Sequence, residues 1–216
     1  MIAGLRCKVC GLRTLIDAEH ADQAGADYLG FILHPASPRY VSLAQYQAMQ
    51  TLLPGRKHVA VAVAPAVTDL AAMRDAGFDC FQLHFPVDLP AATLAAWSEA
   101  VGRDRLWLAP RLPPEAEVRP EWLELADTLL LDAFRADTFG GTGQTGDWEK
   151  FQRHQQAYPQ KRWILAGGLN PDNVVAAVEA TGTKYLDFNS GVESSPGVKD
   201  PQKLARVVAA LRSRHG

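Results

Sequence analysis

The first strand-like run of the chain, residues 6–10, ends on a cysteine, Cys10, that is followed by Gly11. Because side chains alternate along a strand, Lys8 shares a face with Cys10, whereas Cys7 points the other way. A thiol acts as a nucleophile or base once a neighbouring positive charge lowers its pKa, and Lys8 is placed to do so. Cys10 is therefore either a reactive thiol or a small buried apolar residue, and Cys7 is expected only to pack.

A carboxylate, Asp132, ends the otherwise apolar run 128–132. At this place it serves either as a general acid or base or as a cap for the following turn. The next segment, 139–146, is dense in glycine, with Gly143 among its members, and such a backbone can approach a ligand closely. It lacks the Lys-Ser/Thr pair of a P-loop, so it is either a mobile loop or a loop that covers a ligand.

Small residues follow two later strand-like runs, and they indicate an anion site. Small residues expose backbone N–H groups, and the N-terminus of a short helix adds the positive end of its dipole. We expect a phosphate site here in preference to simple tight turns. The residues concerned are Gly167 and Gly168 after the first run, and Asn189, Ser190 and Gly191 at the end of the second.

Three further side chains could contact a ligand. Arg39 lies in a proline-stiffened loop and suits a planar anion such as a carboxylate or phosphate, although a surface arginine would look the same. Gln82 and His84 end another run, where a lone histidine is more often structural than catalytic. Glu193 is interpreted as an ordinary solvated acid. The six histidines have no metal-ligand spacing, so no metal is predicted.

Eight β-rich runs alternate with segments of helical period, the pattern of repeated βα units around a parallel sheet. The expected strands are Arg6 to Cys10, Tyr28 to Leu33, His58 to Val63, Cys80 to His84, Leu106 to Ala109, Thr128 to Asp132, Trp163 to Ala166 and Tyr185 to Asn189. The expected helices are Leu15 to Ala24, Leu43 to Leu53, Asp69 to Ala76, Ala91 to Val101, Glu121 to Leu125, Trp148 to Ala157, Pro171 to Ala180 and Pro201 to Leu211.

Eight such units in 216 residues favour a single-domain (β/α)8 TIM barrel over residues 1–216, with an open doubly wound sheet as the alternative. In such barrels the active site is built at the carboxyl ends of the strands, where all the candidates above lie. The loops after strands seven and eight of these barrels frequently bind phosphate.

The composition excludes several classes of protein. A net charge of −2 from 22 basic and 24 acidic residues predicts no attraction to nucleic acid or to a membrane surface. Three cysteines cannot all pair, and neither a signal peptide nor a membrane-length apolar run is evident. We therefore expect a soluble cytoplasmic protein whose partner is a small molecule.

Seven motifs occur in order along the chain: Lys-Val-Cys-Gly at 8–11, Ser-Pro-Arg-Tyr-Val at 37–41, Gln-Leu-His at 82–84, Leu-Leu-Asp at 130–132, Gly-Gly-Thr-Gly at 140–143, Leu-Ala-Gly-Gly-Leu-Asn at 165–170 and Ser-Gly-Val-Glu-Ser-Ser-Pro-Gly-Val-Lys-Asp at 190–200. Together they make the chain resemble the phosphoribosylanthranilate isomerase family nearly end to end. The last motif is long enough to be distinctive.

The resemblance implies an Amadori rearrangement of a phosphoribosyl substrate, N-(5-phosphoribosyl)anthranilate, to 1-(2-carboxyphenylamino)-1-deoxyribulose 5-phosphate in tryptophan biosynthesis, without a cofactor. It implies that Asp132 is the general acid that opens the furanose ring and that Cys10 is the general base that removes the C2′ proton. Arg39 would bind the anthranilate carboxylate. The implied substrate-binding residues are Arg39, Gln82, His84, Gly143, Gly167, Gly168, Asn189, Ser190 and Gly191.

The chain departs from the family pattern at Phe85, near Arg111 and at Asn189, and Phe85 and Asn189 are expected to reshape the substrate pocket. Two related barrel enzymes are alternatives: the histidine-pathway isomerase, which has an aspartate where this chain has Cys10, and indole-glycerol-phosphate synthase. A catalytically silent barrel that senses a phosphorylated ligand is an alternative from another class. The sequence leaves open whether the protein is a monomer or a homodimer.

Overall fold

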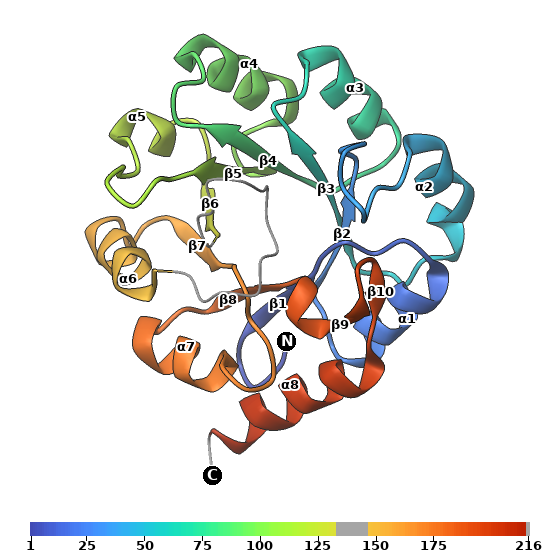
Figure 1. Ribbon diagram of the computed structural model, residues 1–216. Helices are drawn as coiled ribbons and strands as arrows, with labels where there is room; N and C mark the ends of the chain where they lie inside the picture. Colours follow the sequence, from blue (N-terminus) through green and yellow to red (C-terminus); the bar gives the residue numbers. More distant parts are fainter. Residues whose placement is uncertain (133–146, 215–216) are drawn as a thin grey trace.

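Eight parallel strands follow one another around a closed barrel, in which each strand pairs with the next and β8 pairs back with β1 (Figure 1). The computed structural model describes residues 1–132 and 147–214. The barrel strands are β1 Arg6–Val9, β2 Tyr28–Ile32, β3 Lys57–Val63, β4 Cys80–Pro86, β5 Leu106–Arg111, β6 Thr128–Leu131, β7 Arg162–Leu165 and β8 Tyr185–Phe188. This closure confirms the predicted (β/α)8 barrel and rules out an open doubly wound sheet.

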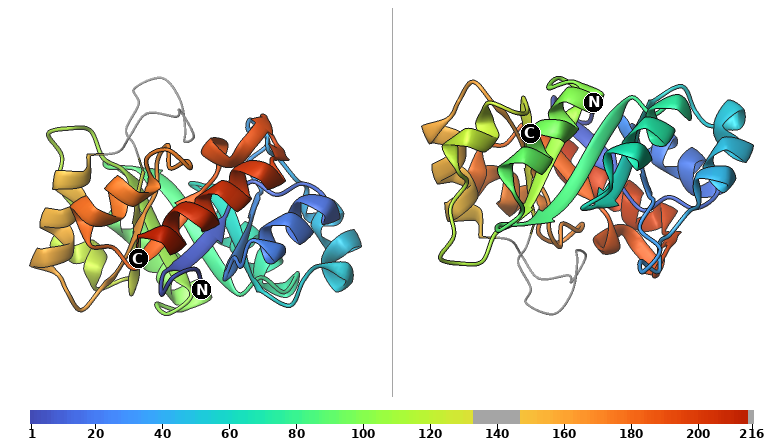
Figure 2. Two further views of the ribbon diagram at one scale, coloured as in Figure 1. Left: turned by 90° about the horizontal axis from the view of Figure 1, so that it is seen from below. Right: turned by 90° about the horizontal axis from the view of Figure 1, so that it is seen from above.

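Helices form a ring around the outside of the barrel (Figure 1), and in the side views they lie along its flanks (Figure 2). They are α1 Leu15–Gln23, α2 Leu43–Met49, α3 Val67–Asp75, α4 Ala91–Val101, α5 Pro120–Leu123, α6 Trp148–Ala157, α7 Val174–Thr181 and α8 Pro201–Ser213. Two 3-10 turns complete them, η1 Gln50–Leu52 after α2 and η2 Ser190–Val192 after β8. Helix α7 begins later than the predicted Pro171, because Asn173 first closes a turn by accepting a 2.8 Å hydrogen bond from the Asn170 N–H.

Side chains of β1 and the residue after it belong to two parts of the core, one between strands and helices and one inside the barrel. Cys7 packs in the outer core between strands and helices, as predicted, whereas Cys10 belongs to the cluster inside the barrel. Lys8 is only 1% exposed and lies on the same side as Cys10. The alternation of side chains along this short strand therefore delivers a thiol and an ammonium group to the barrel interior.

A two-stranded antiparallel hairpin, β9 Glu193–Ser195 and β10 Val198–Lys199, follows η2 at the end of β8. The backbone N–H of Lys199 donates a 2.9 Å hydrogen bond to Asp17 of α1, which ties the hairpin to the barrel wall. The chain then enters α8 at Pro201, where the predicted helix begins, with Asp200 as its N-cap. The hairpin thus holds Glu193 and Lys199 beside the carboxyl end of β1.

Candidate active site

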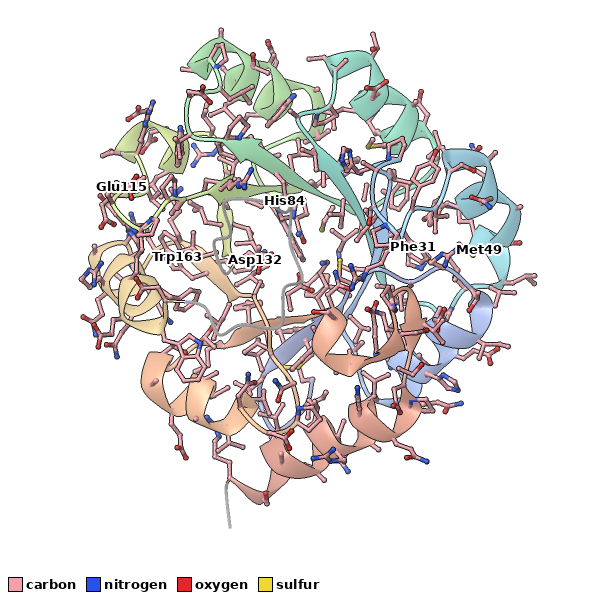
Figure 3. The ribbon with its side chains drawn as sticks, viewed as in Figure 1. Phe31, Met49, His84, Glu115, Asp132 and Trp163 are labelled. Carbon is pink, nitrogen blue, oxygen red and sulfur yellow. The ribbon has the colours of Figure 1, made fainter. Side chains whose placement is uncertain are left out.

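A pocket opens at the carboxyl ends of the strands, the end that the barrel architecture selects for function. Figure 3 shows His84 and Asp132 at the centre of the ring of strands. The residues that line the pocket are Cys10, Ile32, His34, Ser37, Arg39, Val61, Val63, Gln82, His84, Asp132, Ala166, Gly167, Gly168, Asp187, Asn189 and Ser190. Candidates predicted from six separate parts of the sequence thus meet in one cavity.

A buried ion pair lies beneath the thiol of Cys10. The Lys8 Nζ donates hydrogen bonds of 3.0 and 2.9 Å to the two carboxylate oxygens of Asp187, and the same ammonium group interacts with the Cys10 side chain. Lys8 and Asp187 are register partners on the adjacent strands β1 and β8, so the sheet itself holds the pair together. We call Lys8, Cys10 and Asp187 the Cys10 cluster.

Gly30 on β2 makes room for this cluster. A Cβ atom at this position would lie 2.8 Å from Lys8 Cε and 3.0 Å from Cys10 Sγ, closer than a well-packed core tolerates. Any larger residue would push the ammonium or the thiol out of place. The glycine therefore serves the site by its lack of a side chain.

Burial dominates the ionisation of the Cys10 cluster. Burial raises the pKa of the Cys10 thiol, Lys8 opposes the shift and Asp187 adds to it, so the thiol is the favoured form at rest. Burial also raises the pKa of the Asp187 carboxyl in spite of the neighbouring Lys8. Lys8 does lower the thiol pKa, as predicted, but burial raises it by more, so the net shift is upward.

A second buried cluster lies behind Arg39. Its guanidinium donates through Nε and Nη2 to the two oxygens of Glu193, at 2.9 and 2.7 Å, and Lys199 Nζ donates to the same carboxylate at 2.8 Å. We call Arg39, Glu193 and Lys199 the Arg39 cluster. Burial opposes ionisation of Glu193, but the bonds from Arg39 and Lys199 prevail and hold the pKa of Glu193 below its usual value. The interpretation of Glu193 as a solvated acid was therefore wrong.

Gly11 lets the two clusters approach each other. Its backbone has φ +75°, and a Cβ atom there would lie 2.7 Å from Arg39 Cδ and 2.8 Å from Asn189 Oδ1. Asn189 in turn accepts a 3.2 Å hydrogen bond from Lys199. Position 11 thus requires glycine both for its backbone conformation and because a side chain would not fit there.

Gln82 and His84 contact each other on β4. Gln82 Nε2 lies 2.9 Å from His84 Nε2, and Gln82 Oε1 is buried without a hydrogen-bond partner among the described residues. Burial lowers the pKa of His84 to about 4, with the Lys8 charge adding to the effect. The imidazole is therefore neutral near pH 7, and it can donate and accept hydrogen bonds without bringing a charge.

The loops after β7 and β8 contact each other, because a Cβ atom on Gly191 would overlap the Leu169 carbonyl oxygen. Gly167 and Gly168 both have positive φ, at +94° and +65°. Ser190 Oγ is buried and has no hydrogen-bond partner in the part of the chain that the structure describes. An unsatisfied hydroxyl beside the glycine backbone of these two loops suits an anionic ligand.

Asp132 follows the last residue of β6 and lines the pocket. The N-cap of the next helix, α6, is a different residue, Asp147, which accepts a 2.9 Å hydrogen bond from the Lys150 N–H. The turn that Asp132 would cap lies outside the described residues, as does Gly143.

Phe85 points away from the pocket, so the expectation that it reshapes the pocket was wrong. Its ring lies in the outer core with centroids 6.0 Å from Trp97 and 5.2 Å from Trp122, in edge-to-face contacts. The alternation along β4 explains this, because His84 faces inward and its neighbour must face outward. Asn189, by contrast, does line the pocket.

Sequence reasoning missed two charged site residues, Asp187 and Lys199. Asp187 left a signal, since it is a lone carboxylate between apolar neighbours in the eighth strand. Lys199 is 3% exposed, although nothing in its local sequence predicts that a lysine is buried there. Within residues 1–132 and 147–214, no group of three or more His, Cys, Asp or Glu could hold a metal ion. None of the described helices is long and apolar enough to cross a membrane.

Comparison with known proteins gives one consistent result. A family model described as N-(5'phosphoribosyl)anthranilate (PRA) isomerase matches residues 7–210. An N-(5'-phosphoribosyl)anthranilate isomerase of Synechococcus elongatus is 37% identical over 214 residues, covering 96% of each chain.

Solved structures give the same result. A phosphoribosyl anthranilate isomerase from Thermus thermophilus superposes with a TM-score of 0.76 at 35% identity, over 97% of this chain and 99% of that one. A second isomerase structure, solved in complex with reduced 1-(o-carboxyphenylamino)-1-deoxyribulose 5-phosphate, has a TM-score of 0.73 at 27% identity, with 97% and 99% coverage.

Proposed function

The chain belongs to the N-(5'-phosphoribosyl)anthranilate isomerase family, and we propose that Asp132 is the acid and Cys10 the base of its Amadori rearrangement. As a member of that family it is an aldose–ketose isomerase of tryptophan biosynthesis. The observation that supports the proposal most is the shared pocket: Cys10 and Asp132 line it together with Arg39 and the glycine loops.

Ring opening is the first step. Protonated Asp132 donates its proton to the furanose ring oxygen, the C1′–O bond breaks, and the nitrogen lone pair forms the C1′=N iminium. The half-buried site at the end of an apolar strand suits an acid that must stay protonated until the substrate binds.

Proton removal is the second step. The Cys10 thiolate takes the C2′ proton, and the electrons of the C–H bond move toward the iminium nitrogen to form the enolamine. The enolamine then tautomerises to the ketone product. The iminium is the electron sink for this step, and we propose that no metal or cofactor takes part.

The two ends of the substrate carry different anions, and the pocket offers a different partner to each. We assign the anthranilate carboxylate to Arg39, whose Nη1 is outside its bond pair with Glu193. We assign the phosphate to the backbone N–H groups of Gly167, Gly168 and Gly191 and to the Ser190 hydroxyl. Asn189 would contact the substrate between these two anion sites, and Gly143 is proposed to help cover it.

Gln82 and His84 line the same pocket from β4. The neutral His84 imidazole would hydrogen-bond to the ribose hydroxyls, and Gln82 would fix its orientation.

The test is turnover of freshly generated phosphoribosylanthranilate, followed by the loss of anthranilate-type fluorescence without added metal or nucleotide. Asp132→Asn should lower kcat by about 10³-fold, because the ring oxygen loses its proton donor. Asp127→Asn is the matched control, since Asp127 precedes β6 at the opposite end of the barrel and is 51% exposed. Binding of a product analogue without turnover by the wild type would instead favour a phosphorylated-ligand sensor.

We also propose that residues 1–216 form one domain, that the protein is a monomer or homodimer, and that it acts in the cytoplasm. Three free, buried cysteines suit a reducing compartment. The structural relatives include monomers generated from a dimeric phosphoribosylanthranilate isomerase of Thermotoga maritima. Light scattering of the purified protein distinguishes the two oligomeric states, and a single cooperative unfolding transition would support one domain.

A further inference from the structure

The Cys10 cluster holds more than a base needs. A thiol, an ammonium group and a carboxylate share one buried site, in which Lys8 hydrogen-bonds to Asp187 and packs with Cys10 against Gly30, where the two side chains interact. Lys8 is 1% exposed and Asp187 7%. Burying an ion pair is costly, and removal of one partner from such a pair is strongly destabilising. We therefore expect the Lys8–Asp187 ion pair to have a role in the chemistry of the site.

The reason lies in the resting state of Cys10. Burial favours the thiol over the thiolate, yet only the thiolate can remove a carbon-bound proton. Release of the thiol proton to water would leave two buried anions beside one cation. Transfer of the same proton to Asp187 leaves one cation and one anion, as before.

We propose that Asp187 accepts the Cys10 proton through Lys8, so that the base is generated without any change in the net charge of the buried site. The S–H bond of Cys10 breaks as an N–H bond forms on Lys8, while another N–H bond of Lys8 breaks as an O–H bond forms on Asp187. Lys8 remains an ammonium group and pairs with whichever partner is the anion. The inference rests on the proposed role of Cys10 as the base.

The protons balance over one turnover. Asp132 gives one proton to the ring oxygen, and the Cys10 cluster gains one proton from C2′. Tautomerisation of the enolamine adds a proton at C1′ and removes one from O2′, with no net change. The Cys10 cluster then returns one proton to water while Asp132 takes one back, and both sites are reset.

Other charged groups surround the cluster, and they do not offer the same route. Lys199 of β10 acts on both Cys10 and Asp187, but as a cation that is bonded to Glu193 and Asn189 it accepts no proton. His84 of β4 feels the Lys8 charge, and its pKa of about 4 makes it a poor base near pH 7. Among the described residues that interact with the thiol, Asp187 is the one with basic oxygens.

The test is the rate at which iodoacetamide alkylates Cys10 as pH rises from 5 to 9, read by peptide mass mapping. Alkylation requires the thiolate. In the wild type an internal transfer makes the thiolate fraction independent of pH, so the rate should be flat, within about threefold, between pH 6 and 8. Burial raises the pKa of the Cys80 thiol to about 11, so Cys80 is the internal control. Its alkylation rate should rise about tenfold for each pH unit over the same range.

Asp187→Asn removes the acceptor and keeps the shape. Cys10 must then lose its proton to water, so the flat profile should become a titration curve that rises about tenfold per pH unit until the thiol pKa is reached. Asp187→Glu restores a carboxylate and, because position 187 lines the pocket, has space for the longer side chain. This variant should restore the flat profile.

A wild-type rate that rises tenfold per pH unit would overturn the proposal, as would a flat profile in Asp187→Asn. Should Asp187→Asn fail to fold, the double variant Lys8→Met/Asp187→Leu buries no charge and should show the rising profile. A flat profile in the double variant also overturns the proposal. Alkylation needs no substrate, so failure of isomerase turnover and failure of this inference remain distinguishable.

Discussion

The two buried clusters beside the pocket use similar side chains for different ends. The Cys10 cluster has one cation, one carboxylate and a thiol, and is therefore neutral overall. The Arg39 cluster has two cations around the single carboxylate of Glu193, and is therefore positive. The first can move a proton without a change in net charge, whereas the second keeps a positive charge for an anionic substrate group.

The pKa values of the two carboxyl groups shift in opposite directions. Burial acts on both, but among the described residues only Lys8 hydrogen-bonds to the Asp187 carboxylate, Lys199 acts on it without a hydrogen bond, and burial prevails and raises its pKa. Glu193 receives three hydrogen bonds from Arg39 and Lys199, and its pKa is lowered. The number of cations that hydrogen-bond to each carboxylate, set against its burial, distinguishes the fixed anion from the group that can take a proton.

The clusters also differ in how they are held. Lys8 and Asp187 are direct register partners on neighbouring barrel strands. Arg39 comes from the loop after β2, and its partners come from the hairpin after β8. A proton relay tolerates little displacement, so the rigid sheet suits the chemistry, and the loops suit the binding of a substrate that must enter and leave.

The largest expected effect distinguishes Cys7, which lies in β1, from Cys10, which follows directly after it. Cys10→Ala should lower kcat by about 10³-fold or more, because the base is lost. Cys7→Ala removes a thiol of the outer core and should leave kcat within about threefold, with a loss of about 1 kcal/mol in the free energy of unfolding. Equal losses of kcat in the two variants, measured in the fluorescence assay, would contradict the assignment of the base.

The next effect contrasts one cation from each cluster. Lys8→Met leaves the Asp187 carboxylate buried without its ammonium partner and should lower the free energy of unfolding by about 3–5 kcal/mol. Lys199→Met leaves Glu193 its two bonds from Arg39 and should cost about 1.5–3 kcal/mol. Urea denaturation at pH 7 measures both. A larger loss in Lys199→Met would mean that the positive cluster, and not the neutral one, depends on a single cation.

A smaller effect concerns the planar fork of Arg39. Arg39→Lys keeps the charge but gives up the two parallel bonds to Glu193, so the cation is no longer held toward the pocket. We expect KM to rise about tenfold with kcat within about threefold. A matched loss of kcat would place Arg39 in the chemical step and would blur the distinction between the clusters.

The smallest effect is the dependence of stability on pH below 5. Because the pKa of Glu193 is lowered on folding, the unfolded chain takes up the proton first, and stability is lost as pH falls below the usual value of 4.5. Glu193→Gln should therefore show a shallower acid loss in urea unfolding between pH 5 and 3.5. Asp187 has the opposite sign, since its folded carboxyl protonates first, above its usual 3.8. Carbon-13 NMR titration of the two carboxyls checks both directions.

Much of the barrel is predictable from the sequence because its signals are local. The alternation of Cys7, Lys8 and Cys10 and the Asp200-Pro201 helix start need only neighbouring residues. The pair of Lys8 with Asp187 joins positions 179 residues apart, and only closure of the barrel brings their strands into register. Glu193 looked solvated because Arg39 comes from a segment 154 residues away, and because no local pattern shows that the hairpin buries Lys199 against it. The net rise of the Cys10 pKa likewise depends on burial that no local pattern measures.

The central claim is that the neutral cluster serves the chemical step and the positive cluster serves binding. The most direct test is a comparison of kcat and KM for Asp187→Asn and Glu193→Gln at pH 7 in the fluorescence assay. The account predicts that Asp187→Asn lowers kcat about a hundredfold with KM within about threefold, and that Glu193→Gln raises KM about tenfold with kcat within about threefold. The reverse pattern, or equal losses of kcat in both variants, would contradict it.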